Sequence, residues 1–387
     1  MNSENIHNAL IIDRTVRQRL KRLSGANASK CYQCATCSSV CDLSFGDNAF
    51  PRKQLQWAQL GLIDKIKSDY AIWLCHQCND CSVHCPKDVR PGDIMAAMRA
   101  LFISENSVIR TVGRMYERIG VFWPLTVFVP IVAWFSFFLA TKGRTEFISS
   151  AVDFKFETLV PHWMIYSVNI PIFAGALIAL GISGIRAWDA WGAPKATLSM
   201  KLTAFYMAIL DIVLHRKMTD CTTAKQRSTG HFMIMWGFAG ALVTTTVIAM
   251  LLFFSSFKLP LPFFHPLKIF GNIAGALILL GGIYVLQRRW SDSKKMGHSS
   301  AFDNYFVLLI FAVTTTGFGA QFARMANLQA LALFVYLTHL GLVFSLFASL
   351  PFSKFSHMWY RLLAVTRLHL NSQEKPVRLP QPVSVND

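Results

Sequence analysis

The chain has 387 residues, of which 53% are hydrophobic and 15% are charged, and its formal net charge is +17. A soluble chain carries about 25% charged residues, so this composition excludes a wholly soluble protein. A strongly basic balance is typical of nucleic-acid binding, but here the lysines and arginines lie beside long apolar runs. This argues against nucleic acid and predicts membrane lipid as the partner. Polar residues dominate up to about Arg118, and apolar runs dominate from Val121 to Phe352.

The first part of the chain, residues 1–118, is predicted to be a cytoplasmic domain with two [4Fe–4S] clusters. Eight of the nine cysteines lie between Cys31 and Cys85, in two runs with the same C-x2-C-x2-C-x3-C spacing. Met1–Ser29 contains no apolar segment like that of a signal peptide, so metal-bound thiolates are expected rather than disulfides. Zinc sites use two close cysteines per run, whereas four per run favour iron–sulfur cubanes.

The spacing also predicts which cysteines share a cluster. In ferredoxins with two clusters, the fourth cysteine of each run binds the cluster of the other run. The insert between the runs has a proline, Pro51, followed by a helical pattern up to Leu60, which favours a helical ferredoxin domain over a compact β-rich one. The predicted ligands are Cys31, Cys34, Cys37 and Cys85 for one cluster, and Cys75, Cys78, Cys81 and Cys41 for the other.

The second part, residues 119–361, is predicted to be a bundle of six membrane-spanning helices. Each apolar stretch is long enough to cross a bilayer, which takes about 20 helical residues. A shorter stretch, Leu202–Leu214, is interrupted by Asp211 and flanked by basic residues, so we expect a helix that lies in the membrane interface. The six predicted spans are Val121–Ala140, His162–Ile185, His231–Phe254, Leu267–Leu286, Tyr305–Phe322 and Leu328–Leu350.

The charges of the connecting segments predict the orientation in the membrane. The segments 187–228, 288–301 and 353–387 contain fifteen lysines and arginines, against five in the segments that would lie on the other side. Positive charge favours the cytoplasmic side. Both termini are therefore expected in the cytoplasm, and the polar residues 362–387 are expected to form a C-terminal cytoplasmic tail.

Histidines near the spans are candidate haem ligands, because ionisable residues inside a membrane are functional hypotheses by default. His339 and His357 are eighteen residues apart, or about five helical turns, so on one continuous helix they would share a face at two depths. His231 opens the third predicted span at the depth of His357 and is its expected partner. His339 has two alternative partners, His215 and His162.

The histidines have a second interpretation. A histidine within a span often serves only in helix packing, as a hydrogen-bonded side chain. Pro351 lies between His339 and His357 and can kink the helix, which makes their common face approximate. A membrane sensor or anchor with clusters but no haem therefore stays an alternative, and an optical spectrum separates the two.

The residues described above resemble a known group of respiratory proteins. Residues 31–86 resemble the iron–sulfur protein that forms the C subunit of heterodisulfide reductase. Residues from about 160 to 361 resemble the membrane cytochrome b subunit of the same system and the gamma subunit of respiratory nitrate reductase. The segment from His339 to Tyr360, with Pro351-Phe-Ser-Lys-Phe-Ser-His357-Met-Trp, is similar to the last haem-binding helix of that cytochrome. The fusion of both parts resembles the C subunit of the quinone-interacting membrane-bound oxidoreductase of sulfate-reducing bacteria.

This resemblance implies a function and a set of partners. It implies two haem b groups, menaquinone as the substrate, and flavin and iron–sulfur subunits A and B on the cytoplasmic side of a bacterial inner membrane. The chain would pass electrons between menaquinol and these subunits, toward adenylylsulfate reductase in dissimilatory sulfate reduction. The opposite direction, reduction of quinone by soluble donors, stays open.

Overall fold

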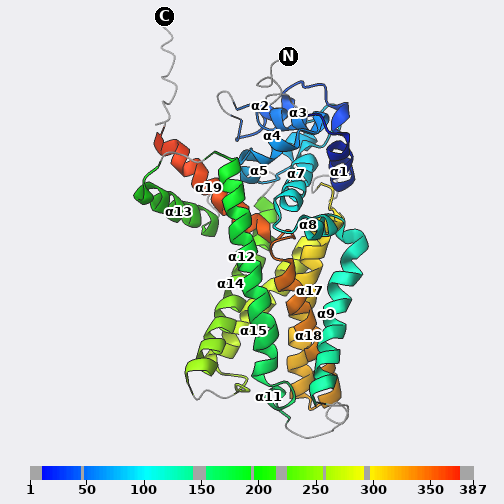
Figure 1. Cartoon of the computed structure of the whole chain (residues 1–387), viewed down its shortest axis with the longest axis vertical. Coiled ribbons are helices and arrows are strands. Elements are labelled where there is room, and N and C mark those ends of the chain that lie inside the picture. Colours follow the sequence, from blue (N-terminus) through cyan, green and yellow to red (C-terminus); the bar gives the residue numbers. More distant parts are fainter. Residues whose placement is uncertain are drawn as a thin grey trace, which may run out of the picture.

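The computed structural model describes residues 11–44, 48–142, 154–192, 196–214, 225–255, 259–291 and 297–374. In these ranges the chain is helical and contains no β-strand. Figure 1 shows a small domain of short helices that lies on one end of a long helical bundle. The predicted mainly α-helical fold, with a cluster domain before a membrane bundle, is confirmed.

The cluster domain is built around one buried helix, α7 (Pro91–Asn106). Pro91 occupies the first helical position, where its missing N–H costs nothing, and Met95, Met98 and Leu101 are fully buried. The helices around it are α1 (Arg14–Ser24), η2 (Ala28–Lys30), α2 (Thr36–Ser39), α3 (Arg52–Leu60), α4 (Ile63–Lys67), α5 (Ala71–Leu74), α6 (Asp80–Val83) and α8 (Arg110–Glu117).

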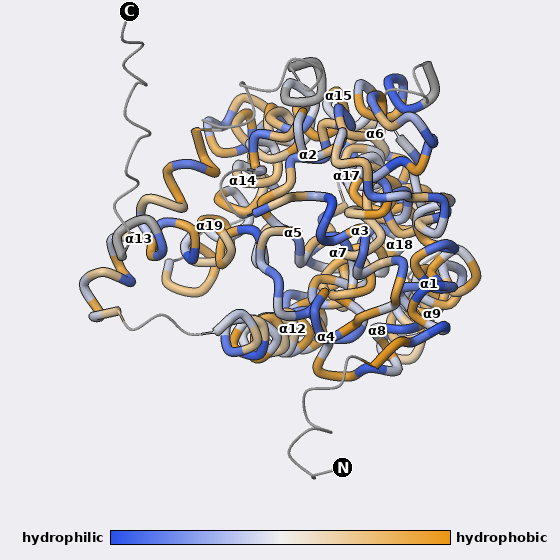
Figure 2. Tube along the Cα trace, turned by 90° about the horizontal axis from the view of Figure 1, so that it is seen from above, coloured by the Kyte–Doolittle hydropathy of each residue, from blue (hydrophilic) through white to orange (hydrophobic). Residues whose placement is uncertain are grey.

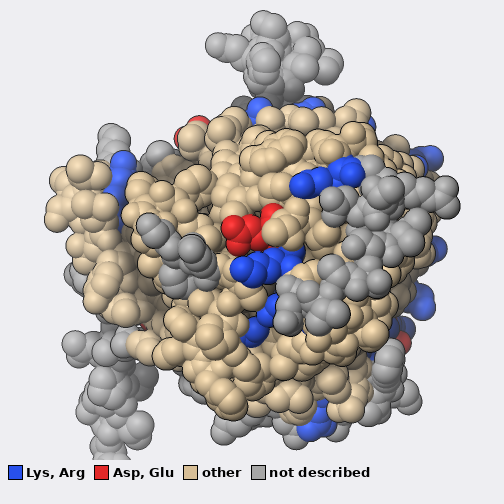
Figure 3. Space-filling view, turned by 90° about the horizontal axis from the view of Figure 1, so that it is seen from below, with Lys and Arg blue, Asp and Glu red and all other residues tan. Residues whose placement is uncertain are grey.

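Six helices are long and apolar enough to cross a membrane, and each overlaps one of the six predicted spans. A short helix, α11 (Phe156–Leu159), lies between the first two. Figure 3 views the end of the bundle that carries α11, and the charged side chains on this face are few. The six helices are α9 (Ile119–Lys142), α12 (His162–Ala190), α14 (Lys225–Phe254), α15 (Pro266–Ser291), α17 (Ala301–Met325) and α18 (Gln329–Ser349).

The spans pack as two groups that meet at α15 and α17. Helix α18 packs against α17, α9 and α12, whereas α14 packs mainly against α15. Glycines let α14 and α15 approach closely: a Cβ on Gly237 would lie 2.7 Å from the Ala274 carbonyl oxygen, and one on Gly281 would lie 3.0 Å from that of Gly230. Small residues at such contacts are typical of helix packing in membranes.

The last predicted span does not continue as one helix. Helix α18 ends at Ser349, the chain turns over residues 350–355, and a new helix, α19 (Ser356–Glu374), begins. Pro351 has no N–H to extend α18, which accounts for the break. The predicted single helix with His339 and His357 on one face is therefore wrong. Residues 362–374, expected in the C-terminal tail, are part of α19.

Helix α13 (Leu198–Val213) lies beside α19, to one side of the bundle (Figures 1 and 2). It covers the stretch predicted as an interfacial helix. Thr197 caps its start by accepting a hydrogen bond from the backbone N–H of Met200. His369 of α19 and Asp211 of α13 form an ion pair at 2.9 Å when the histidine is protonated.

The cluster domain is held on the bundle by buried contacts. The rings of Trp73 and Tyr360 lie 4.8 Å apart. The side-chain amide of Asn106 donates to the Ser183 carbonyl oxygen at 2.7 Å and lies 3.1 Å from the Tyr360 hydroxyl. Buried aromatic and amide contacts of this kind keep the two domains in a fixed relation.

Candidate metal centres

The two cysteine runs have the same backbone conformation. In each run, the residues directly before and after the second cysteine lie in the left-handed region. For residues other than glycine this conformation costs free energy, and such conformations concentrate at functional sites. The four residues are Gln33 (φ 63°) and Ala35 (φ 70°) in the first run, and Gln77 (φ 55°) and Asn79 (φ 68°) in the second.

Backbone N–H groups point at sulfur in both runs. The N–H of Gln33 donates to Cys31 Sγ at 3.4 Å, and the N–H of Gln77 donates to Cys75 Sγ at 3.3 Å. Hydrogen bonds to sulfur stabilise thiolates and set cluster potentials. The sequence repeat is therefore also a structural repeat, which fits two equivalent cluster-binding loops.

The cysteines of the two runs come together between the helices α2 and α6, which pack against each other. Burial raises the pKa of the Cys81 thiol, and the charges of Cys75, Cys78 and Cys41 raise it further. Thiolates so close together need a cationic centre to offset their repulsion. Cys41 comes from the other run, so the geometry fits the predicted crossed ligation.

The same side chains do not fit a mononuclear metal. Among the described residues, no three His, Cys, Asp or Glu side chains converge closely enough to hold a single ion. A tetrahedral zinc site requires such convergence. In a cubane each cysteine binds a different iron, so its thiols lie farther apart, and the cluster fits better than zinc does.

The structure brings His231 of α14 and His357 of α19 together. Their ring centroids are 6.5 Å apart, and the ring planes are inclined by 77°. Two imidazoles that bind one metal from opposite sides, with metal–nitrogen distances of about 2 Å, have centroids roughly 6 Å apart. The two rings therefore fit the axial ligands of a haem.

The hydrogen bonds of the ring nitrogens in His357 and His339 leave the second nitrogen of each for a metal. The Nδ1–H of His357 donates to the Lys354 carbonyl oxygen, and that of His339 donates to the Val313 carbonyl oxygen at 3.0 Å. Metal-binding histidines typically make such a bond through the nitrogen that does not bind the metal. Burial lowers the pKa of His357 to about 3, helped by the charge of Lys354, so its imidazole is neutral.

A cavity of about 330 Å³ connects this histidine pair to the second cysteine run. Its walls include His231, His357 and Cys75, so it lies between the membrane bundle and the cluster domain. Its lining is rich in cations, which suit an anionic cofactor with carboxylates such as haem. These cations are Arg99, Arg288, Arg289, Lys354 and Arg361.

The described surroundings of His339 give it room but no second histidine. A Cβ on Gly317 of α17 would lie 3.3 Å from His339 Cε1, so the glycine leaves space beside the ring. His162 stacks on Tyr166 of its own helix at 5.8 Å, and its Nε2 is buried without a hydrogen-bond partner among the described residues. His215, the other predicted partner, lies outside the described residues.

Two arginines that no sequence motif indicates hold the second cysteine run in place. Arg361 of α19 donates to the Trp73 carbonyl oxygen at 3.2 Å, and its Nη2 lies 3.0 Å from His76 Nδ1. Arg99 of α7 donates to the Cys75 carbonyl oxygen at 3.2 Å. Burial, together with the charge of Arg99, lowers the pKa of Arg361 to about 10. The spacing of Arg361 four residues after His357 is the one available signal, because it places both on one helical face.

Comparisons with known proteins identify the cluster domain. Residues 27–89 match the 4Fe-4S dicluster domain. The domain is similar to an Archaeoglobus profundus protein that is itself like the C subunit of heterodisulfide reductase, with 33% identity over 98 residues, which are 25% of this chain and 52% of that protein. It is also similar to the C subunit of the H(2):CoB-CoM heterodisulfide, ferredoxin reductase of Methanothermobacter thermautotrophicus, 32% identical over 96 residues, with the same coverage.

The membrane part matches a different description. Citrate utilization protein B of Escherichia coli is 25% identical over 358 residues, which cover 87% of this chain and 89% of that protein. No solved structure matches. The expected likeness of the cluster domain to the heterodisulfide reductase iron–sulfur protein is confirmed. Residues 143–377, more than half of the chain, match the model of citrate utilization protein B, and the chain belongs to that family.

Proposed function

We propose that the chain is the membrane electron-transfer subunit of a respiratory complex. It passes electrons between menaquinol in the bilayer and flavin and iron–sulfur subunits in the cytoplasm. One observation carries this proposal: a single cavity is lined by His231 and His357 of the membrane bundle and by Cys75 of the second cysteine run. The similarity of the cluster domain to subunits of heterodisulfide reductase complexes supports it.

The protein's part is to hold and orient the cofactors. His231 and His357 are the proposed ligands of one haem b, and His339 is a proposed ligand of a second. The two cysteine runs hold two [4Fe–4S] clusters with crossed ligation. When bound, these groups accept and donate single electrons. Arg99 and Arg361 fix the second cysteine run against the cavity, which keeps the two kinds of site close.

The resemblance to the quinone-interacting oxidoreductase favours one direction. Menaquinol is oxidised to menaquinone with release of two protons and two electrons. The two electrons reduce flavin and iron–sulfur subunits A and B, and then adenylylsulfate reductase. The inner membrane of a bacterium, with both termini in the cytoplasm, is the proposed location, which the six apolar helices support.

The relative that matches nearly the whole chain supports a second candidate. Its printed name is citrate utilization protein B. In this version, a cytoplasmic oxidation linked to citrate utilization supplies two electrons, and quinone takes them up with two protons. The same cofactor sites serve both directions, so the residues proposed here do not change.

The test is an optical and redox study of the purified full chain. We expect b-type haem bands that a menaquinol analogue reduces. His231→Ala and His357→Ala should each remove the same haem and leave the clusters in place. His265→Ala is the matched control, because His265 is a loop residue without a proposed ligand role. Absence of reducible haem bands in the wild type would make the chain a haem-free anchor. Retention of both haems in His231→Ala would refute the pairing with His357.

The partner and the direction need a second measurement. Membranes that contain the chain are mixed with purified adenylylsulfate reductase and a menaquinol analogue. Reduction of the enzyme that depends on the chain supports the first candidate. Reduction of quinone during oxidation of citrate-derived acids, again dependent on the chain, supports the second.

A further inference from the structure

The two cysteine runs occupy different environments. Cys75 of the second run is buried, lines the cavity beside His357, and follows α5, which packs against α19. Cys34 of the first run is exposed, and the neighbouring Tyr32 is 56% exposed. The second run therefore faces the membrane bundle, and the first run faces outward from the cluster domain.

Exposed cations from several segments surround the first run. They come from α1, from α3, from the loop after the second run, and from the residue before Cys31. We call them the basic rim. Its members are Arg17, bonded to Ser29 at 2.9 Å, Arg52, bonded to Gln33 at 3.3 Å, Lys87, 5.5 Å from the Tyr32 ring centroid, and Lys30.

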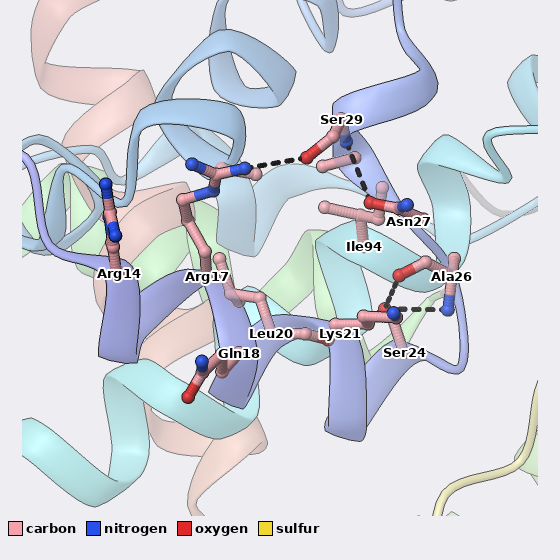
Figure 4. A pocket seen from close by; sticks show the side chains of 12 residues that line it. Arg14, Arg17, Gln18, Leu20, Lys21, Ser24, Ala26, Asn27, Ser29 and Ile94 are labelled. Atoms are coloured by element: carbon pink, nitrogen blue, oxygen red, sulfur yellow. Dashed lines mark hydrogen bonds between the residues drawn. The ribbon is translucent and has the colours of Figure 1, made fainter.

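A pocket of about 340 Å³ adjoins this rim. Figure 4 shows Arg17 reaching from α1 to Ser29, with Arg14 on the same helix beside it. Lys21 of α1 also lines the pocket, and its described lining includes no carboxylate. An excess of cations around a concave surface attracts acidic groups and raises the rate at which an acidic protein associates.

We propose that the basic rim and the adjoining pocket dock an acidic surface of a soluble electron-transfer protein. Electrons then cross between that protein and the cluster of the first run, while the second cluster exchanges electrons with the membrane side. This inference rests on the proposed function and names the surface and the kind of partner that it uses. The short helices α2 and α3 lie at the end of the molecule away from the spans, which favours a soluble protein over a lipid surface (Figure 1).

The test uses a flavodoxin, an acidic flavoprotein, as the probe. Reduced flavodoxin is mixed with the oxidised full chain in detergent, and loss of cluster absorbance is followed at several ionic strengths. Each encounter oxidises the flavodoxin by one electron and reduces the cluster domain by one. For the wild type we expect a second-order rate constant that falls steeply as salt rises, because salt screens the attraction.

The variant Lys30→Glu/Arg52→Glu/Lys87→Glu should lower this rate constant at low salt by about tenfold or more and reverse its salt dependence. The matched control, Lys65→Glu/Lys67→Glu/Arg110→Glu, reverses three charges on α4 and α8 of the same domain and should keep most of the rate. Iron content and reduction by dithionite, measured on both variants, show that the clusters remain.

Three outcomes would overturn the proposal. The rim variant could react as fast as the wild type, or the control could lose as much rate as the rim variant. The rim could also bind vesicles of phosphatidylglycerol while its charge reversal leaves the flavodoxin rate unchanged, which would make it a lipid-binding surface. Failure of the proposed function is seen separately, as loss of haem reduction by quinol in the wild type.

Discussion

At the scale of single residues, Arg361 connects the two domains. It lies one helical turn after His357, donates to backbone carbonyl oxygens at the start of the second cysteine run, and is buried among other cations. A buried positive charge stabilises the form of a nearby cluster that carries the extra electron. Arg361 is therefore a positioning residue that also favours reduction of the second cluster.

This role gives a prediction. Arg361→Gln should lower the reduction potential of the second cluster by on the order of 50 mV, because it removes a nearby positive charge. A redox titration followed by electron paramagnetic resonance measures the shift. Arg361→Lys, which keeps the charge, should shift the potential much less. Equal shifts in the two variants would mean that the guanidinium hydrogen bonds, not the charge, set the potential.

At the scale of elements, the break between α18 and α19 decides where the histidines lie. Helix α18 holds His339 against α17, where Gly317 leaves space beside the ring. The turn over residues 350–355 then starts α19 in a new position, and His357 faces His231 of α14. The two candidate haem sites are therefore formed by different pairs of helices, α17 with α18 and α14 with α19.

The space beside His339 can be tested. Gly317→Val should remove the haem bound by His339 and keep the haem at His231 and His357, because a side chain on residue 317 would meet the His339 ring. Haem content per protein should fall from about two to about one. Gly175→Val is the matched control, since a Cβ on Gly175 of α12 meets nothing within 4 Å. Unchanged haem content in Gly317→Val would contradict the site at His339.

At the scale of the whole molecule, the cluster domain and the bundle share a buried boundary. Tyr360 of α19 packs on Trp73, and Asn106 of α7 bonds to Ser183 of α12. The backbone N–H of His298, in the loop before α17, donates to Asp93 of α7 at 3.0 Å. These contacts place the second cysteine run over the cavity, so changes in one domain should be detected in the other.

Serine variants of single cysteines test this coupling together with the crossed ligation. Cys75→Ser should remove the second cluster and also change the spectrum of the haem at His357, because both line one cavity. Cys34→Ser, at the exposed first run, should affect only the first cluster. Cys41→Ser should remove the same cluster as Cys75→Ser, measured by electron paramagnetic resonance. Loss of the first cluster instead would show that each run binds its own cluster.

The sequence by itself determined the features that depend on local order. The spacing of eight cysteines predicts two clusters, because three ligands of each must come from one short loop. The six spans follow from the length and hydropathy of continuous stretches, and each matches a helix of the structure. The expected approach of His231 and His357 depended on depth alone, and their rings do lie 6.5 Å apart.

Tertiary structure alone decided how these parts are joined. Arg361 and Cys75 are separated by 286 residues, and no local pattern predicts that one bonds to the other. The break after Ser349 is also not predictable from local order, because helical periodicity cannot say whether a chain turns at a proline or kinks through it. The contacts of α19 with α13 and with α5 settle its direction, since burial against distant elements outweighs the local preference of six turn residues.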